Sequence, residues 1–188
     1  MIRIKGRLAA FALLWYPTTN DGSGMNFRRQ VSHALDEEHR TNLDLLGRVE
    51  HAFARAHRTG GARDPELAKL AASFARHIEQ DIGRHFDFEE RELFPRLEAA
   101  GEGDIAGLLK EEHSAIREVA AELLPLAHAA AAGTLDDAGW DALKRGALEM
   151  VERQVAHIQK ETMALLPMLD DLLDDDTDRE LSMNYAAA

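Results

Sequence analysis

The sequence predicts an all-α protein: an up-down-up-down antiparallel four-helix bundle, with a possible short fifth helix at the C-terminus. Three observations lead to this fold class. The 188 residues are rich in alanine, leucine, glutamate and arginine, and only 5 are proline, a composition that favours helices. Four segments carry apolar residues at steps of three and four positions. Short connections separate these segments, which is typical of neighbouring antiparallel helices.

Start and stop signals delimit the four expected helices. The second opens with Asp64 as N-cap and Pro65 at its first position, and it stops before Gly101. The third stops before Gly133, and Pro125 could introduce a bend within it. The capping box that starts at Thr177 predicts the short fifth helix. The expected ranges of the four long helices are about 26–57, 64–100, 104–132 and 134–167.

The two ends of the chain are predicted to lie outside the bundle. Residues 1–25 form a disordered or signal-like extension, 26–172 the bundle, and 173–188 an acidic C-terminal tail with a short helix. The apolar run in the extension, Leu8 to Tyr16, is too short to span a bilayer, and no small-x-small cleavage site follows it. We therefore expect a cytoplasmic protein without a membrane partner; secretion is the alternative interpretation of the basic and apolar N-terminus.

Charge and cysteine usage exclude several classes of function. The formal net charge is −12, with 34 acidic and 22 basic residues, so the surface repels phosphate backbones and a nucleic-acid partner is not expected. The chain has no cysteine, which excludes disulfides, zinc–thiolate sites, iron–sulfur ligation and thiol catalysis. Any bound metal must therefore be held by nitrogen and oxygen, and nine histidines are available.

The chain contains an internal repeat. The pattern His-x-x-x-Glu-x-x-x-Leu-x-Pro-x-Leu begins at His85 and again at His157. A Glu-Glu-His triplet lies upstream of each copy and ends at His39 and at His113. The bundle therefore consists of two similar helical hairpins.

Six ionisable residues occupy positions in the apolar stripes where leucine would normally lie. Burying such groups without partners costs several kcal/mol each, and a shared cation compensates all of them. At about 1.5 Å per residue the six fall in one layer of an antiparallel bundle, and each His-x-x-x-Glu pair offers both side chains on one helical face. The predicted metal ligands are His39, His85, Glu89, His113, His157 and Glu161.

This ligand set suits iron, manganese or zinc, and two facing carboxylates could bridge two ions. The alternative is a set of buried histidines satisfied by carboxylates without a metal. His33 and Glu37 have the same spacing but point off the apolar stripe, so we expect them to face solvent. Asp81 lies one turn before His85, and His77 lies two turns before it. Both are candidates for residues that orient a metal-ligating histidine without binding the metal themselves.

These motifs resemble the hemerythrin-like family, also called the HHE cation-binding domain. The similarity covers roughly Val31 to Leu169 and is most specific in HFDFEERELFPRL, from His85, and HIQKETMALLPML, from His157. The resemblance implies two iron ions with an oxo or hydroxo bridge in a four-helix bundle. It implies Glu89 and Glu161 as bridging carboxylates. The terminal ligands that it implies are His39, His85, His113 and His157.

The chain departs from the respiratory oxygen carriers of this family. They supply a second histidine from the third helix, whereas Arg117 stands four positions after His113 here, and the last pair is His-x-x-x-Glu. The leading hypothesis is a di-iron protein that senses, stores or handles oxygen, nitric oxide or iron. The alternatives are a di-iron enzyme, of iron–sulfur repair or peroxide-consuming type, and a metal-free helical interaction bundle.

Overall fold

The computed structural model describes residues 26–59 and 65–187, and within these residues every regular element is helical. The expectations for residues 1–25 and the start signal at Asp64 lie outside the described residues. The elements in chain order are α2 (Gln30–Thr59), α3 (Pro65–Arg76), η1 (His77–Asp81), α4 (Ile82–Phe88), η2 (Glu89–Leu93), α5 (Phe94–Ala99), α6 (Gly103–Ala131), α7 (Asp137–Lys160), η3 (Glu161–Leu165), α8 (Leu166–Leu172) and α9 (Asp175–Ala187), where η marks a π-helical turn.

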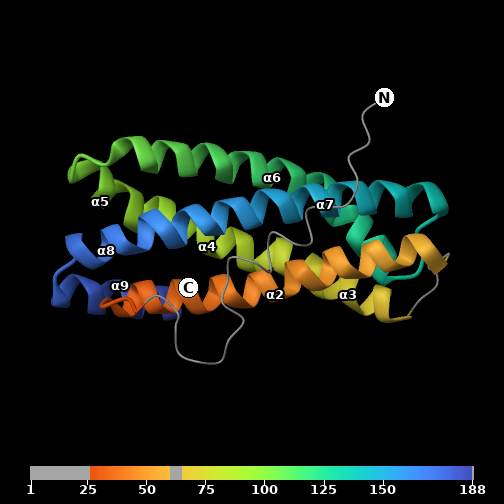
Figure 1. Ribbon diagram of the computed structural model, residues 1–188, viewed down its shortest axis with the longest axis horizontal. Helices are drawn as coiled ribbons and strands as arrows, with labels where there is room; N and C mark the ends of the chain where they lie inside the picture. Colours follow the sequence, from red (N-terminus) through yellow and green to blue (C-terminus); the bar gives the residue numbers. More distant parts are fainter. Residues whose placement is uncertain (1–25, 60–64, 188) are drawn as a thin grey trace.

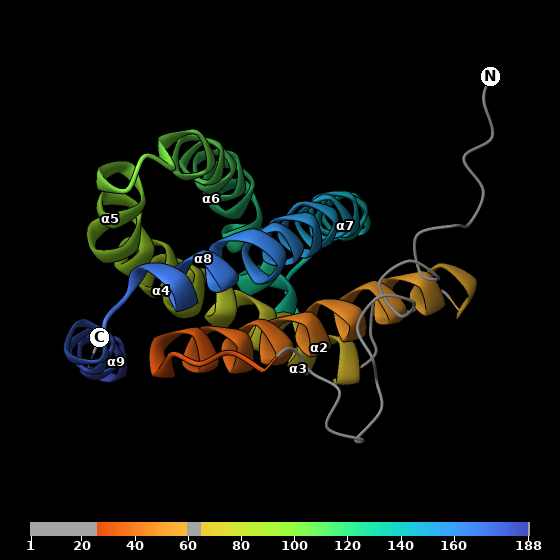
Figure 2. The ribbon, with the colours of Figure 1, turned by 60° about the vertical axis from the view of Figure 1, so that its left-hand side comes forward.

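Four long helical stretches lie side by side along the long axis of the molecule (Figure 1). They are α2, the run from α3 to α5, α6, and the run from α7 to α8. α6 packs on α7, α3 and α5, and α2 packs on α7, α3 and α8. The turned view shows the same grouping, with α9 beside the first turns of α2 (Figure 2). The fold is therefore a helical bundle, as predicted, with α9 as a fifth helix.

A polar layer divides the core of the bundle into two apolar clusters. In α2, Leu35 belongs to one cluster and Leu46 to the other, with His39 between them. The same order holds in α6, where His113 separates Leu109 from Ile116. The other two long stretches also pass from one cluster to the other at their His-x-x-x-Glu pairs. All four stretches thus bring their ionisable residues to one level, as the helix lengths predict.

Two π-helical turns lie just before the prolines of the repeat. Pro95 and Pro167 have no N–H, and their rings crowd the carbonyl one turn earlier in a regular α-helix. The wider turns η2 and η3 precede them, closed by bonds from Phe94 N–H to the carbonyl of Glu89 and from Leu166 N–H to that of Glu161. Sequence periodicity predicted uninterrupted α-helices here, so this detail is a correction.

The C-terminal helix begins earlier than its predicted capping box. α9 starts at Asp175, and Asp174 Oδ1 accepts the N–H of Thr177, so Asp174 is the cap and Thr177 already lies within the helix. Asp178 of α9 accepts the N–H groups of Gln30 and Val31, at 2.9 and 3.0 Å, and so caps the first turn of α2. α9 is in this way fastened to the start of the bundle.

Glycines with positive φ and helix caps form the connections between the later helices. Gly101 (φ 94°) and Gly133 (φ 69°) occupy the left-handed region that ends a helix. Asp136 caps α7 by accepting the N–H of Gly139 at 2.7 Å. α6 runs without interruption through Pro125.

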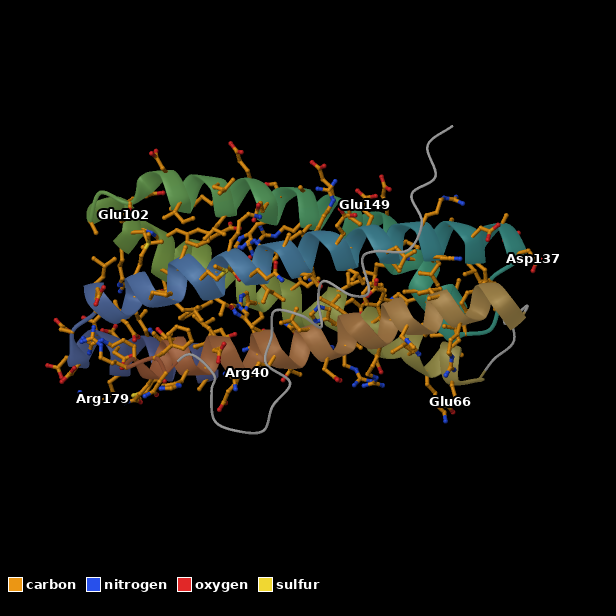
Figure 3. All side chains as sticks on the ribbon, in the orientation of Figure 1. Arg40, Glu66, Glu102, Asp137, Glu149 and Arg179 are labelled. Carbon is orange, nitrogen blue, oxygen red and sulfur yellow. The ribbon has the colours of Figure 1, made fainter. Side chains whose placement is uncertain are left out.

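Charged side chains cover the outside of the bundle (Figure 3). The labelled residues all lie on the exposed surface: Arg40, Glu66, Glu102, Asp137, Glu149 and Arg179. The ionisable groups of the polar layer are instead buried, with Glu89, Glu161, His39 and His113 at 0% exposure.

Candidate metal centre

The structure brings the six predicted ligand residues together in two overlapping groups. One group is His39, His85, Glu89 and Glu161; the other is Glu89, His113, His157 and Glu161. Within each group the ligand atoms lie within 4.8 Å of one another. Both glutamates belong to both groups, so each can serve two positions. This is the arrangement expected of two ions that share two carboxylates.

Each shared carboxylate directs one oxygen toward each position. Glu161 Oε2 lies 3.1 Å from His39 Nε2 and 3.8 Å from His85 Nε2. Its Oε1 lies 2.7 Å from His157 Nε2 and 3.7 Å from His113 Nε2. Glu89 behaves alike, with Oε1 at 3.4 Å from His85 and Oε2 at 3.3 Å from His113. The four Nε2 atoms therefore converge on the carboxylates in two pairs.

Several buried polar atoms in this layer lack a well-formed hydrogen bond. Among the described residues, buried side-chain atoms without a hydrogen-bond partner include both oxygens of Glu89, both of Glu161 and Nε2 of His39. The Nε2 atoms of His113 and His157 face each other at 3.0 Å. Two nitrogens bound about 2.1 Å from one ion at a right angle are separated by about this distance. The residues present thus fit a metal pair, and their atoms are left unsatisfied without one.

The outer nitrogen of every histidine in the layer has its own partner. Each Glu-Glu-His triplet lies on the first helix of a hairpin. Its second glutamate contacts the histidine of the His-x-x-x-Glu pair on the second helix of that hairpin. Glu38 Oε1 lies 3.3 Å from His85 Nδ1, and Glu112 Oε2 lies 3.0 Å from His157 Nδ1. Such contacts fix the orientation of an imidazole and leave its Nε2 for a metal.

The residue after each shared glutamate supports one of the two remaining histidines. Glu90 Oε1 lies 2.8 Å from His113 Nδ1, and Thr162 Oγ1 lies 3.1 Å from His39 Nδ1. Tyr185 of α9 adds a further contact on the first hairpin, with its hydroxyl 3.1 Å from His85 Nδ1. The outer contacts therefore follow the internal repeat, with threonine in place of glutamate in one copy.

A basic residue partly exposed at the surface pairs with each outer glutamate. The pairs are Arg84 with Glu38 at 2.5 Å, Arg117 with Glu90 at 2.6 Å and Lys160 with Glu112 at 2.6 Å. Burial raises the pKa of Glu38, but His85, Tyr185 and Arg84 outweigh it and lower that pKa to about 2. For Glu112 the hydrogen bond from His157 is the main cause of a lowered pKa. These carboxylates stay ionised at neutral pH.

The shared carboxylates draw protons onto the histidines when no cation is present. Burial lowers the pKa of His157, but the charge of Glu161 and contacts with Glu112 outweigh it and raise the pKa to about 9. Burial lowers the pKa of His85, but the charge of Glu89 and nearby carboxylates outweigh it and raise that pKa well above its usual value. The pKa of His113 is also raised, by Glu161 and Glu89. In the metal-free protein these three histidines therefore bind a proton more tightly than a free imidazole does.

A cavity of about 20 Å³ adjoins this layer. Its walls include His39, His85, His157 and Glu161, but neither Glu89 nor His113, so it meets the layer on one side. By this measure a volume above about 10–15 Å³ holds one water molecule. The cavity therefore has room for a small ligand.

The other histidines considered in the sequence lie outside this layer. His33 and Glu37 are exposed, as their position off the apolar stripe predicts. His77 is buried at 1% exposure, and its Nε2 bonds Oε1 of Gln154 at 3.1 Å. Gln154 lines the cavity, so His77 reaches the layer through that side chain. The side chain of Asp81 lies outside what the structure describes.

Sequence reasoning missed the outer partners, although two signals were present. Glu38 and Glu112 belong to the triplets that mark the repeat, and Glu90 directly follows a predicted ligand. Thr162 occupies the position of Glu90 in the second copy. Tyr185 has no signal of this kind, because α9 brings it to His85 from 100 residues away.

Comparison with known families agrees with this geometry. The family model described as the hemerythrin HHE cation-binding domain matches residues 30–169, more than half of the chain. The chain belongs to the hemerythrin HHE family. The matched family is described as cation-binding, and the His and Glu residues of the polar layer are candidate ligands for a cation. No curated protein matches the chain significantly. In the described residues no helix is both long and apolar enough to cross a bilayer.

Proposed function

We propose that this HHE protein binds two non-haem iron ions and senses, stores or handles oxygen, nitric oxide or iron. The observation that carries the proposal is the pair of overlapping ligand groups, in which Glu89 and Glu161 belong to both. The unsatisfied oxygens of these glutamates argue against a metal-free interaction bundle. In this proposal the long helices take the up-down-up-down order, which lets all four contribute at one level.

In the proposed centre His39 and His85 hold one ion, and His113 and His157 hold the other. Glu89 and Glu161 bridge the two, because each has an oxygen on either side. The outer glutamates and Thr162 orient the imidazoles, and the two apolar clusters exclude bulk water from the layer. Bound iron supplies redox chemistry and open positions for small ligands.

Iron is proposed over other metals on two grounds. The donor set contains imidazole and carboxylate but no thiolate, which suits iron, manganese and zinc. The family resemblance then favours iron. The small cavity beside the layer supports a small ligand.

Metal analysis of protein purified without chelator tests the proposal. We expect close to two iron atoms per chain and near-ultraviolet absorption from the oxidised centre. Metal-free protein that is equally helical and equally stable would refute cation binding. Zinc alone after expression in iron-replete medium would remove the redox function. Sustained consumption of peroxide, at rates far above those of free iron, would favour the enzyme alternative.

A further inference from the structure

The cavity beside the polar layer is lined by amide and apolar side chains besides the candidate ligands. The amides are Asn42 and Gln154, and the apolar residues are Ile82, Phe86 and Ile158. An apolar cavity would suit a neutral diatomic molecule. Two amide side chains beside the open side of the centre indicate a ligand that forms hydrogen bonds.

The two copies of the internal repeat differ at Gln154. Gln154 lies three residues before His157, and Ile82 lies three residues before His85, so they occupy equivalent positions in the two copies. Both line the same cavity. Nothing in the repeat or in the packing of an apolar core requires an amide at one of these positions, since isoleucine serves at the other.

His77 fixes the orientation of Gln154. Oε1 of Gln154 can only accept, so the 3.1 Å contact makes His77 Nε2 the donor. Both side chains are buried, at 1% and 4% exposure. With the oxygen engaged in this bond, the amide NH₂ is the group left to donate toward the cavity.

The backbone at His77 is also unusual. The π-helical turn η1 begins at His77, closed by a bond from Ile82 N–H to its carbonyl. η2 and η3 each precede a proline, but no proline lies near η1. Isolated π-helical turns often occur at functional sites, where they redirect a side chain. This turn places His77 against Gln154.

We propose that Gln154, oriented by His77, selects the ligand of this cavity in favour of small monoanions that accept a hydrogen bond. The inference rests on the proposed iron centre and narrows its ligand class. Gln154 donates to the free end of the anion, and His77 is a positioning residue that acts through Gln154. A neutral diatomic molecule such as nitric oxide gains less from the same donor, because a hydrogen bond is stronger when its acceptor is charged.

Azide binding to the oxidised iron-loaded protein tests the proposal. Gln154→Ile installs the residue that the first copy of the repeat uses, and it should weaken azide binding roughly 10- to 100-fold, the effect of losing a hydrogen bond to a charged group. Nitric oxide binding to the reduced protein should change less than about 2-fold. His77→Phe should weaken azide binding by less than Gln154→Ile, and His77→Gln, which keeps a donor, should restore it.

His33→Ala is the control, because His33 is exposed and lies outside the polar layer. It should leave azide binding within about 2-fold. Iron content and thermal stability are measured for each variant. Equal weakening of azide and nitric oxide in Gln154→Ile would overturn the proposal, since Gln154 would then only maintain the cavity. Unchanged azide affinity with full iron content would also overturn it. Failure of the unmodified protein to load iron would refute the proposed function and this inference with it.

Discussion

Removing the metal should reverse the pH dependence of stability. In the metal-free protein the pKa of His157 is raised from 6.5 to about 9, chiefly because the charge of Glu161 outweighs burial. A group with a raised folded-state pKa stabilises fully below its unfolded pKa and loses that effect as pH rises through the folded value. His85 and His113 are shifted in the same direction. The metal-free protein should therefore lose stability between pH 6.5 and pH 9.

The size of the loss follows from the pKa shift. For His157 alone the shift corresponds to about 3 kcal/mol of pH-dependent stability. In a domain of this size that amounts to a decrease in Tm of roughly 6–12 °C. The metal-loaded protein should show the opposite trend, because metal binding requires neutral imidazoles and strengthens as they lose protons. Binding to the folded state alone then raises its stability.

Thermal unfolding followed by far-ultraviolet circular dichroism, with chelator-treated and iron-loaded protein across this pH range, measures both trends. Glu161→Gln should flatten the slope of the metal-free protein, because it removes the anion that holds the proton on His157. His33→Ala, at an exposed position, should leave the slope unchanged. Metal-free protein that is as stable at pH 9 as at pH 6.5 would refute the assignment of these protons.

Three further predictions concern the metal directly. Glu161→Gln should lose more iron per chain than Glu89→Gln, because Glu161 faces all four histidines and Glu89 faces two. His33→Ala should keep the full iron content. Equal losses of iron from both glutamate variants would contradict the geometry. Glu112→Gln should weaken metal affinity roughly 10- to 100-fold in chelator competition, because the carboxylate orients His157, and unchanged affinity would exclude that role. Stepwise addition of oxygen should oxidise the reduced protein, because the centre opens onto the cavity. Absorption spectra follow this oxidation. An oxygenated form that releases oxygen under vacuum would restore the carrier hypothesis.

The sequence predicts the level at which the helices carry their ionisable residues, because helix rise and apolar period are fixed by the backbone. The same regularity brings His39 and Glu161 together across 122 residues of chain. It does not predict the π-helical turns, although Pro95 and Pro167, which have no N–H, lie just after two of them. The contact of Tyr185 with His85 depends on how α9 packs, which no local pattern specifies.

The internal repeat explains both the strength and the limit of that prediction. Side chains that make the same contact in both hairpins occur in both copies of the repeat. Glu38 and Glu112 could therefore have been assigned as partners of a histidine from their positions alone. Positions that differ between the copies carry information of another kind. Glu90 supports His113 with a charged oxygen, whereas Thr162 supports His39 with a neutral hydroxyl.

A carboxylate partner makes an imidazole a stronger donor than a hydroxyl does. In the proposed centre the two metal positions would therefore be unequal, although their direct ligands are the same in number. His39, which lines the cavity, contacts the neutral hydroxyl of Thr162. His113, which does not line the cavity, contacts the charged carboxylate of Glu90. The amide of Gln154 stands on the cavity side as well. Both departures from the repeat therefore lie beside the cavity: Gln154 lines it, and Thr162 contacts His39, which lines it, whereas Glu89 and His113 do not.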